Sequence, residues 1–177
     1  DVLMGSITVK DAALIKPLRA LIGRMGIGVS PDDASLVLRG FETLGIRLRH
    51  SERVALDFAH RISRHPLVKQ VLHPALETCP GHAIWKRDFT GACGLFGLIL
   101  RPVPEKAVAA MLDGLSHFGL GFSWGGFESL LIPAHIRRTA RPFPAEGPVL
   151  RVHAGLEDAD DLIADLEKGF ARLKDAT

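Results

Sequence analysis

The sequence predicts an α/β protein of the α+β kind, with a small, mostly antiparallel sheet that carries helices on one face. Three observations lead to this prediction. Short apolar runs alternate with amphipathic helical patterns over residues 66–177, which we expect to form a C-terminal α/β domain. A long helical pattern, bent near Gly45, occupies residues 30–65 as a connecting helix. An N-terminal arm, residues 1–29, precedes it and is too short to bury its own faces.

Within the arm, residues 6–9 resemble a short β-strand and residues 11–25 a helix. The long helix then has a clear start, because Ser30 is a good N-cap and Pro31 suits the first helical position. Two aspartates follow, where they favour the positive end of the helix dipole. Apolar residues recur at helical spacing as far as Ile62. The helix ends at His65, because a residue before proline is pushed out of the α region.

The remaining elements are short. Strands are expected at residues 68–73, 91–100, 118–123 and 149–153, and an amphipathic helix at residues 104–115. Asp158 caps a final helix, whose apolar residues also recur at helical spacing.

Composition excludes several classes of protein. Apolar residues make up 47% and charged residues 24%, a globular balance that excludes disordered and fibrous chains. The net charge is only +2, without a basic stripe, so no nucleic-acid partner is indicated. The early apolar stretch, residues 14–29, contains two arginines, a lysine and a proline, so no membrane span is expected. Cys79 and Cys93 indicate reduced thiols in a cytoplasmic protein. A start at Asp1 rather than methionine suggests a fragment or processed product.

Two segments could carry chemistry, residues 123–129 and residues 147–158. The first is a strand end that breaks into a glycine turn, which lets backbone approach a ligand closely. The second places Arg151 in an apolar strand, where its charge needs an ionic partner or a ligand. A guanidinium matches a carboxylate with two parallel hydrogen bonds. The residues alone leave open whether Arg151 binds a ligand or pairs with an internal acid such as Glu157, and whether Trp124 is a ligand contact or a core aromatic.

Other patterns are weaker. Two cysteines with scattered histidines lack the paired spacing of a zinc site, so no metal is expected. The glycines of residues 25–28 lack the preceding strand of a dinucleotide fingerprint. The acidic run at residues 157–161 is explained by a helix N-terminus.

Several stretches also carry a family resemblance, and their order and spacing match along all 177 residues: 1–5, 25–26, 30–34, 38–40, 43–44, 73–74, 85–91, 123–129 and 151–158. The chain resembles the C-terminal part of the Cys/Met-metabolism enzymes that depend on pyridoxal 5'-phosphate (PLP), which have the fold type I, aminotransferase-like architecture. Many members have leucine where this chain has Trp124. Tryptophan there resembles the branch that cleaves cystathionine by β-elimination.

The resemblance implies roles for six residues. Arg151 would grip the α-carboxylate of an amino-acid substrate, and Ser123 and Trp124 would contact the same carboxylate. Met4, Gly5 and Ser6 would lie near the cofactor.

The resemblance also implies what precedes this chain. The Schiff-base lysine of the family lies in a Lys-Tyr…Gly-His-Ser-Asp segment whose last residue matches Asp1, so no catalytic residue is expected here. Lys10 does not correspond to that lysine. The cofactor-binding N-terminal domain would be a missing partner, and members are usually homotetramers, so a homo-oligomer is expected.

In the complete protein the implied reaction converts L-cystathionine into homocysteine, pyruvate and ammonia, with PLP as electron sink and the lysine as base. The chain alone is predicted to be inactive. Alternatives are a cystathionine γ-lyase, a γ-synthase or a methionine γ-lyase of the same family. From a different class, the alternative is a non-catalytic oligomerising module.

Overall fold

The computed structural model describes residues 2–177 in two compact units, which divide between Gly45 and Ile46. This division falls inside the long helix α2 (Pro31–Ile62), which is one helix without a break at Gly45. Its start is the predicted one, because the Ser30 hydroxyl oxygen accepts a 3.0 Å hydrogen bond from the Asp33 N–H. Division of the parent protein into an arm, a connecting helix and a C-terminal domain stays a prediction.

The first unit contains the short 3-10 helix η1 (Ala12–Leu14), helix α1 (Ile15–Arg24) and the beginning of α2. Within residues 2–45 no residue is buried, so the unit has no core of its own. The strand expected at residues 6–9 is wrong, because no strand of residues 2–177 pairs with that segment. Asp1, which carries part of the family resemblance, lies outside the described residues.

The second unit is built on one five-stranded sheet, in the order β1-β2-β5-β4-β3. The strands are β1 (Val68–Leu72), β2 (Leu95–Leu100), β3 (Phe118–Gly119), β4 (Ser129–Pro133) and β5 (Val149–His153). Every pairing is antiparallel except that of β3 with β4, which confirms the mostly antiparallel sheet that the sequence predicts. Strand β4 and the short helix α3 (His82–Asp88) have no counterpart in that prediction.

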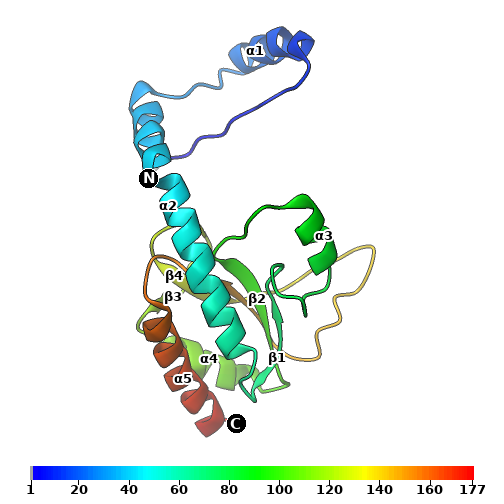
Figure 1. The fold of residues 1–177 in the computed structure, drawn as a ribbon, viewed down its shortest axis with the longest axis vertical. Coiled ribbons are helices and arrows are strands. Elements are labelled where there is room, and N and C mark those ends of the chain that lie inside the picture. Colours follow the sequence, from blue (N-terminus) through cyan, green and yellow to red (C-terminus); the bar gives the residue numbers. More distant parts are fainter. Residues whose placement is uncertain (1) are drawn as a thin grey trace. The chain divides into compact units, whose positions relative to one another are not determined.

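One face of the sheet carries the core, where α4 (Glu105–Asp113), α5 (Ala159–Asp175) and the last turns of α2 pack (Figure 1). Alternation along β5 decides which side chains point there, because neighbouring residues of a strand face opposite sides. Leu150 and Val152 are fully buried against the helices. The helices contribute large side chains such as Phe58 and Phe170 to the same cluster.

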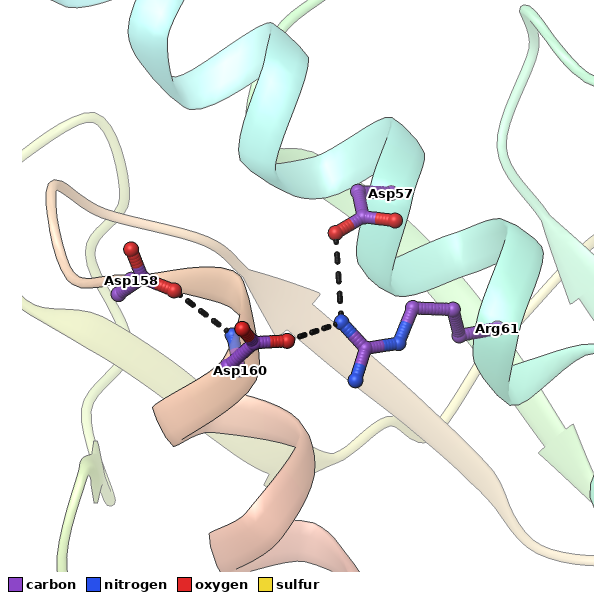
Figure 2. A network of polar contacts seen from close by, with 4 residues as sticks. All are labelled: Asp57, Arg61, Asp158 and Asp160. Atoms are coloured by element: carbon purple, nitrogen blue, oxygen red, sulfur yellow. Dashed lines mark hydrogen bonds and ion pairs between the residues drawn. The ribbon is translucent and has the colours of Figure 1, made fainter.

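Helices α2 and α5 are also joined by a polar network at the surface (Figure 2). The Arg61 guanidinium donates to Asp57 at 3.4 Å and to Asp160 at 2.5 Å. Asp158 caps α5 as predicted, and its carboxylate accepts from the Asp160 N–H at 2.9 Å. These groups are solvent-exposed, so the network contributes little to stability.

Candidate functional site

Arg151 and His153 lie on the face of the sheet opposite the core, because they alternate along β5 with the buried Leu150 and Val152. The register places Arg151 between Gly97 of β2 and Ile132 of β4. Its guanidinium therefore rises from the middle of the sheet.

The Arg151 side chain contacts the loop that follows β3. Its Nη2 donates to the Gly121 carbonyl at 2.8 Å and to the Ser123 carbonyl at 3.2 Å. The guanidinium carbon lies 5.7 Å from the centre of the Trp124 ring, within cation–π range. Its Nε is buried without a hydrogen-bond partner, and no carboxylate of residues 2–177 forms an ion pair with Arg151. A half-buried cation therefore has no counter-charge in the described part of the chain.

The alternative in which Glu157 neutralises Arg151 is wrong. The Glu157 carboxylate instead accepts from the Ser129 N–H at 2.8 Å and from the Ser129 hydroxyl at 2.7 Å. That hydroxyl oxygen accepts from the Gly155 N–H at 2.9 Å. A Cβ at Gly155 would lie 2.2 Å from the Phe127 carbonyl oxygen, so only glycine allows this close approach. The network fastens the chain after β5 to the start of β4.

Trp124 is not a core aromatic, because its side chain is 60% exposed. Ser123 is exposed as well. The structure thus brings together Arg151, Ser123 and Trp124, as one site requires. Their role as substrate ligands stays a prediction.

His153 is a member of this site to which sequence reasoning gave no role. The residue is 3% exposed, its Nε2 accepts from the Gly125 N–H at 3.1 Å, and its buried Nδ1 has no hydrogen-bond partner. Gly125 has φ +84°, a backbone conformation that favours glycine. The available signal was strand alternation, which puts a residue two positions after Arg151 on the same face.

Met4, Gly5 and Ser6 belong to the first unit, where they line a cleft of about 790 Å³. The cleft is walled mostly by apolar side chains, and among the residues that the structure describes Arg19 is the only charged one and no lysine is present in its lining. These residues therefore do not by themselves fit PLP, which needs an amine for covalent attachment and a cradle for its phosphate. A contact between them and the cofactor stays a prediction for the complete protein.

No group of three or more potential metal ligands comes together within residues 2–177. Burial raises the pKa of the Cys79 thiol, which disfavours the thiolate that binds metals. No helix of the described chain is both long and apolar enough to cross a membrane.

Comparison with known proteins gives consistent results. The model of the "Cys/Met metabolism PLP-dependent enzyme" family matches residues 1–171. A putative cystathionine beta-lyase of Rhizobium johnstonii is 46% identical, over 97% of this chain and 44% of the relative. Cystathionine beta-lyase MetC of Escherichia coli is 42% identical, over 98% of this chain and 45% of the relative. The crystal structure of cystathionine gamma synthase from Xanthomonas oryzae pv. oryzae, in complex with aminoacrylate and cysteine, superposes with a TM-score of 0.84 at 36% identity, over 96% of this chain and 46% of that one. The chain thus spans less than half the length of each of these relatives.

Proposed function

The chain belongs to the family of Cys/Met metabolism PLP-dependent enzymes, and on that premise we propose that it is the C-terminal portion of a carbon–sulfur lyase. The proposed reaction is β-elimination of L-cystathionine to homocysteine, pyruvate and ammonia. When bound, PLP supplies the electron sink of such reactions. This chain supplies the site for the substrate carboxylate, and the preceding part of the complete protein supplies the lysine and the rest of the cofactor pocket.

The unpaired Arg151 is the observation that carries the proposal. A guanidinium that is half buried without a counter-charge favours an anionic ligand, and its planar fork fits a carboxylate. The carbonyls of Gly121 and Ser123 hold the Nη2 end of the fork, which leaves the Nε–H without a partner. Arg151 would thus fix the α-carboxylate, and with it the position of Cα relative to a base outside this chain.

Two observations bear on which bond the enzyme breaks. By the family resemblance, Trp124 stands where the β-eliminating branch has tryptophan, and a putative cystathionine beta-lyase and cystathionine beta-lyase MetC are 46% and 42% identical to this chain. The structural neighbour named cystathionine gamma synthase keeps γ-chemistry as the second candidate. The products separate the two, because β-elimination of cystathionine yields pyruvate and γ-elimination yields 2-oxobutyrate.

The test uses the complete protein with PLP and L-cystathionine, with Arg151→Lys as variant and Arg64→Lys as control. Arg64 is an exposed arginine of the same unit, after the end of α2. Loss of a charge-assisted bidentate contact should raise KM roughly 10- to 100-fold in Arg151→Lys, and Arg64→Lys should leave it unchanged. A wild-type enzyme that forms neither oxo acid, or an Arg151→Lys variant with unchanged KM, would contradict the proposal.

We also expect the 177-residue chain alone to be inactive. Incubation with PLP, borohydride reduction and intact-mass analysis should show no stoichiometric adduct. A single modified lysine, for example Lys10, would mean that this chain carries its own cofactor site and that the match of Asp1 to the family's lysine segment is wrong.

The first unit indicates that the chain has partners, because none of its described residues, 2–45, is buried. Twelve of its large apolar side chains are exposed, among them Leu38 and Phe41 at 67% and 62%. We propose that the preceding PLP domain and further copies of the complete protein cover them in a homo-oligomer. Light scattering of the complete protein that shows a monomer at high concentration would count against this homo-oligomer. Cys79 and Cys93 are both free thiols, which supports a cytoplasmic location.

A non-catalytic oligomerising module is the alternative from another class. A parent reading frame that encodes the Lys-Tyr…Gly-His-Ser segment before Asp1 supports the enzyme, and a start codon at this point supports the module.

A further inference from the structure

The loop of residues 121–126, which joins β3 to β4, is held by two side chains of a single strand. Within residues 2–177 its hydrogen bonds run to Arg151 and His153 of β5. Arg151 binds the first half of the loop, through the carbonyls of Gly121 and Ser123. His153 binds the second half, through the Gly125 N–H.

Trp124 lies between these two attachments. Its ring contacts the Arg151 guanidinium, and it is the direct neighbour of Gly125 in the chain. Gly125 has φ +84°, which glycine adopts without strain, but glycine also leaves the backbone free to take other conformations, so the turn depends on a partner for its N–H. The His153 imidazole is the partner that the structure provides.

The chemistry of the imidazole is specific. Its Nε2 accepts from the Gly125 N–H at 3.1 Å and lies 3.3 Å from the Gly126 carbonyl oxygen, so both contacts with the turn run through this one nitrogen. A Cβ at Gly94 would lie 2.1 Å from the Ala154 carbonyl oxygen and 3.2 Å from His153 Cε1, so glycine there allows the close approach of both the backbone and the ring. The ring is therefore packed in place, with its acceptor directed at the turn.

We propose that His153 is a positioning residue of the carboxylate site: it accepts the Gly125 N–H and thereby holds Trp124 and Ser123 in register with Arg151. The inference rests on the proposed function, because it assigns His153 to the substrate clamp rather than to general stability. Its contribution should appear in substrate binding, hence in KM, while kcat is largely kept.

The experiment compares three variants of the complete PLP-loaded protein. His153→Gln places an amide oxygen near the position of Nε2 and keeps the acceptor. His153→Leu has a similar size without any acceptor, and His153→Asn is polar but reaches only the position of Nδ1. We expect KM for L-cystathionine to rise about three- to tenfold in the Leu and Asn variants, with kcat within about twofold. His153→Gln should restore KM close to that of wild type.

Hydrogen exchange of the peptide that contains Gly125 gives a readout that needs no activity. Exchange should accelerate by a similar factor in His153→Leu and His153→Asn, and not in His153→Gln, while peptides of β2 remain unchanged. If wild type forms no oxo acid, the proposed function fails, whatever the exchange shows. If wild type is active but KM and Gly125 exchange are the same in all variants, or His153→Gln behaves as His153→Leu, the positioning role is refuted. Should His153→Leu fail to fold, the contrast between the Asn and Gln variants decides alone.

Discussion

Asp165 offers the sharpest test of how the second unit is held together. It lies on α5, is 2% exposed and binds the segment that connects α4 to β3. Its Oδ2 accepts from the Ser116 N–H at 2.9 Å and from the His117 N–H at 2.8 Å, and its Oδ1 accepts from the Ser116 hydroxyl at 3.0 Å. One carboxylate therefore satisfies three donors of that segment.

The size of the effect depends on the replacement. Asp165→Ala leaves these donors without their partner. Ser116 and His117 are exposed enough for water to reach the donors, which limits the expected loss in the free energy of unfolding to about 2–3 kcal/mol. Asp165→Asn can keep its oxygen at the two N–H groups and donate its NH₂ to the Ser116 hydroxyl oxygen, which also accepts. The Asp165→Asn variant should lose only about 1 kcal/mol of its free energy of unfolding, because the charge is missing.

The stability difference between wild type and Asp165→Asn should also depend on pH. Burial raises the pKa of the Asp165 carboxyl, but the hydrogen bonds from His117 and Ser116 outweigh it and bring the pKa below the ordinary 3.8. Because the pKa in the folded state is depressed, the stabilisation is present above pH 3.8 and is lost as the pH falls through the folded value. The difference between wild type and Asp165→Asn should therefore shrink below pH 3.8.

Urea denaturation followed by circular dichroism, at neutral and acid pH, measures these differences. Asp175→Ala is the control, since it removes an exposed carboxylate from the last turn of the same helix and should change stability by less than about 0.5 kcal/mol. Equal losses for Asp165→Ala and Asp165→Asn, or a difference that does not depend on pH, would refute the reasoning.

The remaining predictions concern the turns around the candidate site. Gly125→Ala should cost about 1–2 kcal/mol, because alanine is strained at φ +84° although its Cβ would meet nothing within 4 Å. Gly126→Ala has equal space without the positive φ and should be close to neutral. Thermal melting measures both variants, and equal effects would contradict the backbone explanation. Ser129→Ala removes the hydroxyl that joins Glu157 to Gly155 and should cost roughly 2 kcal/mol; chemical denaturation with no shift in midpoint would show that this link adds nothing.

Much of the fold follows from local patterns. The predicted start of α2 at Ser30 and Pro31 and the Asp158 cap of α5 are confirmed, because a cap depends on neighbouring residues alone. The strand predicted at residues 149–153 is β5 residue for residue, and it fixes which side chains share a face. Strand β4 was missed because its five residues follow a glycine turn and read as a continuation of the loop. The strand predicted at residues 6–9 fails because a strand needs a neighbour, and local pattern does not supply one.

The candidate site was likewise predictable in part from the sequence and in part only from the tertiary structure. The sequence by itself determined the family resemblance, the choice of Arg151, Ser123 and Trp124, and the mismatch between a charged arginine and an apolar strand. Only the tertiary structure decided that Glu157 binds Ser129 rather than Arg151, and that His153 accepts from the Gly125 N–H. The reason is physical: the partner of a buried polar group comes from another strand or loop, about 30 residues away in this chain, and its choice depends on sheet order and register.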